Sequence, residues 1–571
     1  MQDIMSKRNL SLLIQICVCG FSFSCASPEI NDKYISNQSL MMSKRLEMFD
    51  ALVKEIDRVD ADRKDILKLK GIDWDQNILD LRSEIEKAET PQELGRSLRK
   101  IDSLYPHIQS QQVLNPELES VPLGSKVVLP FKMVPTIKDS TAKQFKYFIA
   151  QVSPDNFEPG PVPHKGDEVV EINGKGIEEW EKDNFRFCKS TSAAVCALEL
   201  NHNFRNENIG WSHEQPIEMQ VLHGADKISV KLIAKIEASG GFEPSETADI
   251  YNDVFPCGID IKRRYFEFGF LYKGRRLCVL GSHAHPGVAV MRIANFNYSG
   301  SADSIRTLKQ EISLFKSAYW NEHSSEIKNL VIDLIDNEGG DPPVGYEALL
   351  FDHPFQGQYV KYKKLPEWTA GRIDDNLFTL DGDGGKVIWM KSMKEEGRIA
   401  QKAMGDFFDP IPRYCVSSKL DCRSGKFEPD GHSFKGEVRV MLNQNCILAC
   451  SSFVADLHEH LGERVSFYGL PDSGDSVAAQ MSTNLYLTPT GKKPFEIKSR
   501  VWNFAAPPIT KDLLLTQTLA FSVTTDATGT PVSGKSRKIK KMPELNYKNY
   551  PMNFPGEVLK LILNDIKTST R

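Results

Sequence analysis

The sequence predicts a mixed α/β protein with several domains, and three observations lead to that fold class. Its 571 residues compare with about 150 for one typical domain, so we expect two to four domains. Apolar residues recur at helical spacing before residue 105, and strand-like runs begin at Lys126. Beyond residue 250 strands and helices alternate, and Leu330–Ile335 has the continuous apolar run of a buried strand in an α/β sheet.

The composition is that of a soluble globular protein and argues against nucleic acid as a partner. Hydrophobic residues make up 40% of the chain and charged residues 26%. The formal net charge is −5, so the chain lacks the basic balance that attracts phosphate backbones. After the N-terminal stretch no apolar run reaches the roughly 18 residues of a membrane-spanning helix. We therefore expect no transmembrane span in the mature chain.

The first 26 residues have the three parts of a secretory signal peptide. Lys7 and Arg8 supply the positive start, and Leu10–Phe23 is an apolar stretch too short to span a bilayer comfortably. Small residues then precede a predicted cleavage site after Ala26. An alternative is that Cys25 becomes the lipidated first residue of an anchored protein. Either interpretation predicts export, to a periplasmic, extracellular or outer-membrane-anchored location.

The cysteine count indicates disulfide bonds. Eleven cysteines occur, and eight remain once Cys17, Cys19 and Cys25 are removed with the signal peptide. An even number in an exported chain favours disulfides, with buried free thiols as the alternative. Zinc is less expected, because no cysteine-histidine knuckle occurs. The eight cysteines form four pairs of near neighbours: Cys188 and Cys196, Cys257 and Cys278, Cys415 and Cys422, and Cys446 and Cys450.

A helical region is expected near the N-terminus, after a disordered lead. Residues 27–41 are polar and predicted to be disordered, and residues 42–110 carry apolar side chains at helical spacing. Thr90, Pro91 and Glu93 mark a helix start, because threonine can cap the helix, proline suits its first position and the glutamate completes a capping box.

A β-rich domain is predicted over residues 125–240. Its most specific stretch is His164–Gly174, in which a Gly-Asp turn, an alternating strand and an Asn-Gly turn follow one another. This stretch resembles the core signature of PDZ domains. The resemblance implies binding of an extended peptide along a sheet edge. An unrelated hairpin is the alternative, and the insert Phe187–Pro216 departs from a compact PDZ pattern.

The stretch Val331–Gly340 carries the strongest sign of chemistry. It is a buried strand that ends in Asn-Glu-Gly-Gly. Glycines at such a strand end let backbone N–H groups turn toward a ligand, and such donors can hold the oxyanion of acyl transfer. Gly339 and Gly340 are therefore candidate oxyanion donors, with a plain strand-to-helix turn as the alternative.

This stretch resembles the DLRxNxGG signature of the tail-specific (C-terminal processing) protease family. Gly287–Asn297 resembles the strand that precedes the signature in that family, and the resemblance extends over about residues 105–510. It implies a crotonase-like protease core in residues 250–571, beside the PDZ-like domain. It also implies a serine-type peptidase that acts on protein or peptide chains, with no cofactor and no metal.

The family's catalytic positions are degenerate in this chain. Counted from Asn443, the serine position of the family falls on Leu448, and leucine has no atom that attacks a carbonyl. The lysine position falls on Asp475, in a stretch that resembles the family's GxxTxGK motif. The resemblance further implies that the amide of Ala449 would complete an oxyanion hole with the two glycines.

A histidine offers one substitute for the missing lysine. His107 resembles a histidine that other branches of the family place before the PDZ domain. A structural or solvated role is the alternative for this residue. The acid that would orient it is expected late in the chain, and Asp526 and Glu544 are both candidates.

Three side chains could act as a displaced nucleophile. Cys450, Ser451 and Ser452 follow Leu448 by two to four positions. A displacement of about 1 Å can reduce a rate on the order of a hundredfold, so any such activity is expected to be weak. Cys450 qualifies only if it is not oxidised with Cys446, because only a thiolate attacks.

Two further patterns are expected to be structural. His283 and His285 form a pair without a third metal ligand at a recognisable spacing, so no metal site is predicted there. The basic run Lys535–Lys541 is expected to be a solvated loop, with contact to anionic lipid or cell wall as the alternative.

Two functional hypotheses follow from this sequence. The first is an exported serine-type peptidase relative that still acts on peptide chains despite Leu448. The second is a catalytically inactive pseudo-protease that serves as a peptide-binding or scaffolding module. Both predict a protein or peptide partner.

Overall fold

The computed structural model describes residues 28–569 apart from short gaps and the longer segments 105–111, 119–124, 153–159, 203–215, 239–263, 297–303, 366–405, 413–425, 475–479, 502–511 and 533–536. The expected signal peptide and its alternative lipidation site therefore lie outside the described residues. Within the described part of the chain, no helix combines the length and the apolar character needed to cross a bilayer. Other residues of interest outside the described part are His107, Cys257, Cys415, Cys422 and Asp475.

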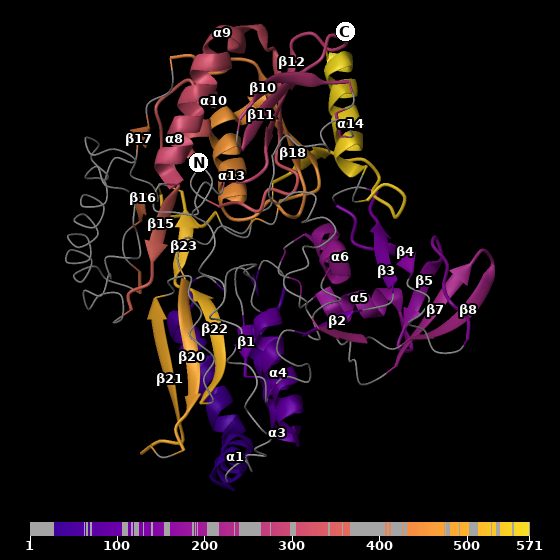
Figure 1. Ribbon diagram of the computed structural model, residues 1–571, viewed down its shortest axis with the longest axis vertical. Helices are drawn as coiled ribbons and strands as arrows, with labels where there is room; N and C mark the ends of the chain where they lie inside the picture. Colours follow the sequence, from indigo (N-terminus) through magenta and orange to yellow (C-terminus); the bar gives the residue numbers. More distant parts are fainter. Residues whose placement is uncertain are drawn as a thin grey trace, which may run out of the picture.

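The N-terminal helices pack against a sheet built mostly from C-terminal strands (Figure 1). Leu52 and Ile56 are fully buried and share one hydrophobic core with Leu515. The helices are α1 (Pro28–Val59), α3 (Trp74–Lys87) and α4 (Pro91–Leu104), and the strand order is β1 (Gln112–Leu114), β22 (Leu513–Ala520), β20 (Gln480–Leu487), β21 (Phe495–Val501). These C-terminal strands thus leave the α/β core, within which the sequence analysis had placed all of residues 250–571.

The start of the helical region also differs from expectation. Helix α1 begins at Pro28, within the residues 27–41 that were expected to form a disordered lead. Met41 lies within this helix and is 1% exposed, and burial of its side chain in the shared core stabilises the helix beyond its weak local propensity. The capping box is confirmed, because the Glu93 amide donates to Thr90 Oγ1 at 3.2 Å and the Thr90 amide to Glu93 Oε2 at 3.2 Å.

The predicted β-rich domain forms a sheet of its own, at the lower right in Figure 1. The helices α5 (Ile177–Phe185) and α6 (Ala193–His202) accompany this sheet, and the disulfide between Cys188 and Cys196 ties the segment between them. That cysteine pairing is confirmed. The strand order is β3 (Phe131–Thr136), β4 (Lys146–Val152), β5 (Glu168–Ile172), β7 (Ile217–His223), β8 (Asp226–Leu232), with β6 (Lys175–Gly176) on β5, while β2 (Ser125–Val128) pairs with β9 (Lys235–Ala238).

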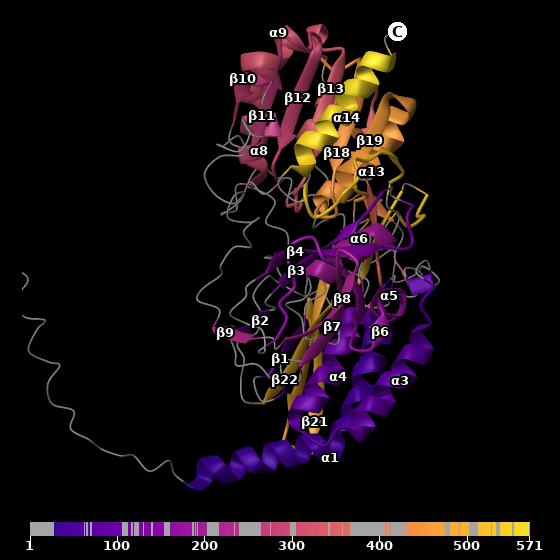
Figure 2. The same ribbon diagram turned by 90° about the vertical axis from the view of Figure 1, so that its right-hand side faces the viewer.

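A seven-stranded sheet forms the α/β core, at the top of both ribbon views (Figures 1 and 2). Side chains of β13 alternate between its faces, as a strand requires. Ile332 lies in the core that includes α8, α10 and α13, whereas Val331 lies in the core that includes α14 and the PDZ-like sheet. The strand order is β10 (Gly269–Lys273), β11 (Leu277–Gly281), β12 (Val288–Ile293), β13 (Asn329–Asp333), β18 (Glu437–Leu442), β19 (Val465–Gly469), β24 (Ile539–Lys541).

Strands β12, β13, β18, β19 and β24 run parallel, and the predicted mixed α/β class is confirmed. Helices cover both faces, which is how a parallel sheet buries its strands. The helices are α8 (Ser304–Phe315), α10 (Val344–Leu350), α13 (Ala449–Leu461) and α14 (Phe554–Ser569), with short helical turns over Lys316–Trp320, Asn321–His323, Ser324–Glu326 and Gly462–Arg464. Smaller pairings join β14 (Phe355–Gln356) to β17 (Lys426–Phe427) and β15 (Tyr359–Tyr362) to β16 (Ile411–Pro412) and β23 (Ser522–Thr525).

The end of the predicted basic loop is an edge strand. Lys540 and Lys541 lie in β24, and their ammonium groups contact the Asp565 carboxylate of α14 at 2.9 and 2.5 Å. These two contacts help to hold the Asp565 pKa far below its usual range. The expectation of a solvated loop is therefore wrong for these two residues, because the lysines have an acidic partner within the fold.

Replacement of Ile56 by alanine should destabilise the unit formed by the N-terminal helices and the β22 sheet by about 2–5 kcal/mol. The reason is that Ile56 is fully buried at that contact. Denaturant unfolding, combined with amide exchange of β20 and β22, measures the loss. Leu79→Ala is the matched control, because Leu79 is 60% exposed and its truncation should cost less than about 0.5 kcal/mol. Equal effects of the two changes would contradict the packing described here.

Candidate functional site

A strained residue connects β18 to α13. Strand β18 ends at Leu442 and helix α13 begins at Ala449, with Leu448 as its N-cap residue. Leu448 has φ 56° and ψ −119°, a backbone conformation that side-chain-bearing residues rarely adopt. Such a conformation costs on the order of 1–3 kcal/mol and persists where the surroundings enforce it. Outliers of this kind concentrate at functional sites, which favours a functional role for the start of α13.

A glycine turn lies directly against this strained residue. The turn follows β13, and the Asn337 side chain holds it by donating to the Ile293 carbonyl at 3.0 Å and accepting from the Gly339 amide at 2.9 Å. Gly339 has φ 84°, and a Cβ there would lie 2.6 Å from the Ile447 carbonyl oxygen and 2.9 Å from the Ala449 nitrogen. Glycine is therefore required on both counts. The predicted approach of this turn to the start of α13 is observed.

Hydrogen bonds between the two loops fix this arrangement. Asn443 Oδ1 accepts from the Asp336 amide at 2.9 Å, and Asn443 Nδ2 donates to Asp336 Oδ1 at 2.6 Å. Asn445 Nδ2 donates to the same carboxylate oxygen at 3.1 Å, and Arg264 lies 3.2 Å from the other. The sequence analysis missed this network. The available signal was that Asp336 and Asn443 each follow a parallel strand, and such strand ends meet at one edge of a sheet.

Two backbone amides remain available at this site. Among the described residues, none accepts a hydrogen bond from the amide of Ala449 or of Gly340. Ala449 is the first residue of a 13-residue helix, whose N-terminus attracts negative charge. Gly339 was also expected to be a donor, but its amide donates to the Asn337 side chain. Its role is instead to let the backbone of this turn lie close to the start of α13. An amide at a helix N-terminus can hold a carbonyl oxygen or a carboxylate.

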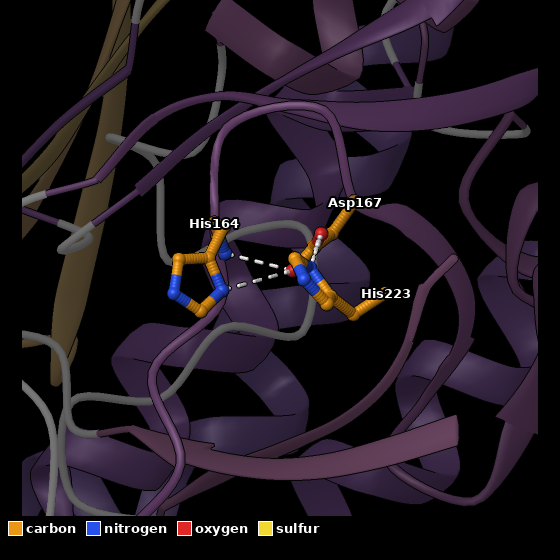
Figure 3. Close-up of side chains that lie close together, drawn as sticks. All are labelled: His164, Asp167 and His223. Carbon is orange, nitrogen blue, oxygen red and sulfur yellow. Dashed lines mark hydrogen bonds and ion pairs between the residues drawn. The ribbon is translucent and has the colours of Figure 1, made fainter. Parts of the chain in front are cut away.

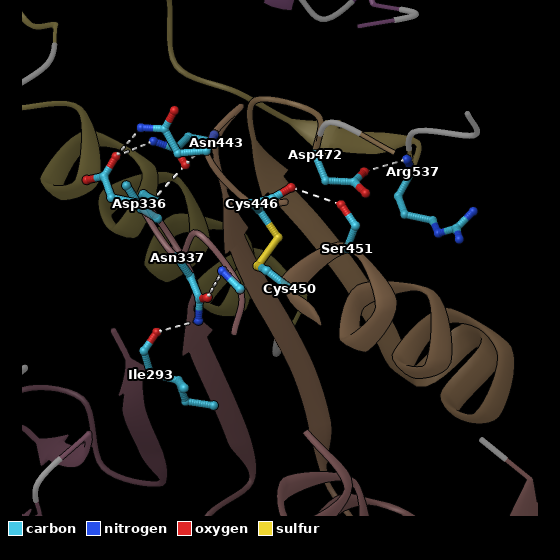
Figure 4. The surroundings of a disulfide bond; sticks show 12 residues. Ile293, Asp336, Asn337, Asn443, Cys446, Cys450, Ser451, Asp472 and Arg537 are labelled. Atoms are coloured by element: carbon cyan, nitrogen blue, oxygen red, sulfur yellow. Dashed lines mark hydrogen bonds between the residues drawn. A yellow bond between two sulfur atoms is a disulfide. The ribbon is translucent and has the colours of Figure 1, made fainter. Parts of the chain in front are cut away.

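The predicted disulfide between Cys446 and Cys450 is confirmed. It joins the turn before α13 to the first turn of the helix (Figure 4), and both cysteines are completely buried. A sulfur in a disulfide carries no thiolate, which is the form of cysteine that attacks a carbonyl. The candidate nucleophile Cys450 is therefore excluded in this state of the protein. Cys278 is disulfide-bonded as well, and its expected partner Cys257 lies outside the described residues.

The two serines that follow are buried. Ser451 is 3% exposed, and its hydroxyl donates to the Cys446 carbonyl at 2.9 Å. Ser452 is 1% exposed, and its carbonyl accepts from Gln358 Nε2 at 3.0 Å. The Ser451 hydroxyl and the Ser452 carbonyl thus both form hydrogen bonds inside the protein. Both serines lie within α13, beyond the strained turn at Leu448, which we call the elbow.

A buried carboxyl lies near Ser451. Asp472 follows β19, is 1% exposed, and accepts from the Arg537 amide at 2.9 Å. Burial raises the pKa of Asp472, and the Arg537 charge, the Arg537 amide and a hydrogen bond from the Ser451 side chain oppose that effect. Ser451, Asp472 and Arg537 line one narrow crevice together with Gln358. The predicted lysine-equivalent residue of this segment, Asp475, lies outside the described residues.

The remaining predicted site residues lie elsewhere or have other partners. Asp526 Oδ1 accepts from the amides of Thr528 and Thr530, both at 2.9 Å, so this carboxylate holds a local turn. Glu544 is exposed on the segment after β24. His285 Nε2 lies 3.1 Å from Glu267, which gives this histidine an acidic partner. The position of His107 is not described, so the structure does not choose between the two candidate acids.

Replacement of Gly339 by alanine tests how tightly the two loops pack. The new Cβ would meet backbone atoms at 2.6 and 2.9 Å and would adopt an unfavourable φ. Gly174→Ala is the matched control, because Gly174 has φ 76° but nothing within 4 Å. We expect the control to cost about 1 kcal/mol from backbone strain. Gly339→Ala should cost a further 1–3 kcal/mol or so in denaturant unfolding. Equal losses would show that the loops do not pack as described.

Comparison with known proteins bears on the fold. No protein-family model matches the sequence. No curated protein matches it either. Among solved structures, mature CPAF complexed with lactacystin matches with a TM-score of 0.58 at 12% identity, covering 93% of this chain and 98% of that chain. Mature CPAF itself matches with a TM-score of 0.58 at 12% identity, covering 92% and 97%.

A third solved structure matches with a lower score. The photosystem II D1 C-terminal processing protease matches with a TM-score of 0.32 at 11% identity, covering 90% of this chain and 96% of that chain. The chain thus resembles mature CPAF in fold, at low sequence identity. It has a mixed α/β fold with a crotonase-like core and a PDZ-like domain, as the sequence analysis expected.

Proposed function

We propose that this chain is an exported protein with a C-terminal processing protease fold that binds peptide chains without cleaving them. The observation that carries the proposal is Leu448 at the strained elbow before α13. A strained strand-to-helix turn of this kind presents the side chain of its central residue at the top of a sheet, where hydrolases place a nucleophile. Leucine offers no nucleophilic atom. The backbone of an acyl-transfer site is therefore kept while its reactive group is absent.

The neighbouring side chains support the same proposal. Cys450 is held in a disulfide, and Ser451 and Ser452 are buried within the first turn of the helix. None of the three thus presents a free thiolate or an exposed hydroxyl at the elbow. Hydrolysis would require one of these groups to move toward a bound carbonyl, and the fully buried disulfide holds this turn in place.

The kept backbone can still bind a peptide. The amides of Ala449 and Gly340, with the helix N-terminus behind them, suit a carbonyl oxygen or the terminal carboxylate of a protein tail. Recognition of a carboxylate by backbone amides needs no nucleophile. We therefore propose that the former reaction centre serves as a binding site for peptide ends.

The PDZ-like sheet offers a second contact for the same chain. Strand β3 lies at one end of the sheet order, and helix α6 packs along it. An extended peptide can add to such an edge through main-chain hydrogen bonds. Pro135 lies within β3, and proline is accepted in edge strands because it has no amide to donate. This edge is our candidate for the peptide-binding groove of the domain.

Export is part of the proposal. Disulfides form and persist in oxidising compartments such as the periplasm and the extracellular space. The bonds between Cys188 and Cys196 and between Cys446 and Cys450 support such a location. The signal-like first 26 residues give the route, with a lipid anchor at Cys25 as the alternative.

Slow hydrolysis through Ser451 is the second candidate function. The observation that favours it is the position of Ser451 beside Asp472 in one crevice, since a carboxyl with a raised pKa can accept a proton from a hydroxyl. In that case purified wild-type protein should cleave an unfolded protein, and Ser451→Ala should abolish the cleavage. Ser451 is buried, and its hydroxyl also hydrogen-bonds the Cys446 carbonyl, which makes this the weaker candidate.

Leu448→Ser is the test of the proposed function. Wild-type protein should neither cleave casein nor react with a serine-directed phosphonate. The variant places a hydroxyl at the elbow beside the amides of Ala449 and Gly340, so it should form a covalent phosphonate adduct. Mass spectrometry detects that adduct. The new hydroxyl can attack a carbonyl held near these amides, so weak peptidase activity should accompany labelling.

A neighbouring substitution controls for loop accessibility. Ile447→Ser adds a hydroxyl one residue before the elbow and should not be labelled. If Leu448→Ser is labelled without turnover, addition of Asp475→Lys should supply a base and raise the rate. Robust cleavage by wild-type protein would refute the non-cleaving function proposed here. Labelling of both serine variants to the same extent would refute the special role of position 448.

A further inference from the structure

We propose that His164, Asp167 and His223 form a Zn²⁺ site on the PDZ-like domain. Their side chains converge at one end of the sheet (Figure 3). The site lies apart from the elbow at Leu448, and the proposal does not depend on the function proposed above. The sequence analysis expected no metal. Asp167 and His223 are 56 residues apart and show no ligand motif.

The backbone brings these three residues together. His164 and Asp167 belong to the turn before β5, in which the Asp167 amide donates to the His164 carbonyl at 3.1 Å. That turn is bonded to β4, since the Gly166 amide donates to the Ile149 carbonyl at 2.8 Å. Strands β5 and β7 are antiparallel with Glu168 opposite Leu222, so the next positions outward are Asp167 and His223. Strand register therefore sets the histidine beside the carboxylate.

A buried carboxylate lies at the centre of the cluster. Asp167 is 4% exposed, and its Oδ1 lies 2.7 Å from His223 Nδ1. Its Oδ2 accepts from the His164 amide at 2.7 Å and lies 3.8 Å from His164 Nδ1. The two imidazole rings are 4.8 Å apart between centroids. One buried carboxylate thus lies beside two imidazoles that are exposed to solvent.

These groups match the ligands that zinc prefers. Zinc binds imidazole nitrogen and carboxylate oxygen at about 2.0–2.2 Å, so tetrahedral ligand atoms lie roughly 3.3 Å apart. One donor atom from each residue lies within 4.8 Å of the others. The imidazole side chains are 66% and 53% exposed, so they can turn inward without repacking a core. Two imidazoles disfavour calcium and magnesium, which select oxygen ligands.

Two other described histidines, His353 and His323, lie beside acidic residues but outside any group of three potential metal ligands among the described residues. His353 lies 3.0 Å from Asp352, and His323 lies 3.3 Å from Glu326. Within the described residues, the grouping of three potential ligand side chains occurs at His164, Asp167 and His223. Three protein ligands leave a fourth zinc position for water or for a group from a bound chain.

The site also has a structural consequence. A Cβ at Gly166 would lie 2.9 Å from the Tyr547 hydroxyl, so the ligand-bearing turn packs against the segment that leads to α14. Tyr547 also stacks on Phe148 of β4, with ring centroids 5.6 Å apart. Zinc would link this turn to the β7 end. We therefore expect zinc to stabilise the PDZ-like domain and its contact with the C-terminal segment.

Zinc titration of the purified chain tests the proposal. After treatment with a chelator, wild-type protein should bind one Zn²⁺ per chain by calorimetry, with a dissociation constant on the order of micromolar. His164→Ala and His223→Ala should each weaken binding by at least about tenfold. His353→Ala is the matched control and should bind as wild type. Zinc should also raise the unfolding temperature of wild type and of the control more than that of the two site variants.

The site variants change exposed side chains, and circular dichroism verifies that they fold. Absence of saturable zinc binding by wild type at about 100 µM would overturn the proposal. Wild-type affinity in both His164→Ala and His223→Ala would also overturn it, because the bound zinc would then lie elsewhere. Loss of binding in His353→Ala would have the same meaning.

Discussion

The contact between the turn after β13 and the start of α13 is the constraint on which the candidate site depends. Asp336 and Asn443 join the two loops through paired hydrogen bonds, and Gly339 allows the backbones to approach because it has no Cβ. The approach leaves the amide of Ala449 beside the glycine turn. The strained backbone of Leu448 is held within this frame. Loss of this contact would let Leu448 relax and would move the Ala449 amide away from the glycine turn.

Retention of strain at Leu448 without a nucleophile has a physical explanation in binding. Strained conformations persist where the surroundings over-determine them. Here the disulfide between Cys446 and Cys450 and the inter-loop hydrogen bonds enforce the elbow whatever side chain it carries. The same backbone presents amides at a helix N-terminus, which favour a carbonyl oxygen or carboxylate.

The PDZ-like sheet and the α/β core share one hydrophobic core. Val331 of β13 and Val558 of α14 belong to the same buried cluster as Tyr147 of β4. The segment that carries Tyr547 contacts both the ligand-bearing turn and β4. A ligand on the PDZ-like domain thus acts on a part of the protein that is packed against the core. This packing gives the proposed zinc site a route by which it could stabilise more than its own turn.

The local features could be predicted from the amino-acid sequence. They are the α/β class, the capping box at Thr90, the glycine turn, the neighbouring disulfide pairs and the leucine before α13. Such features depend on residues close in the chain, so periodicity and spacing reveal them. Other features became apparent only from the three-dimensional structure. They are the pairing of C-terminal strands beside the N-terminal helices, the burial of Ser451, the hydrogen bond from the Gly339 amide to Asn337 and the contact between His223 and Asp167. These depend on strand register and packing between distant segments, which no local pattern encodes.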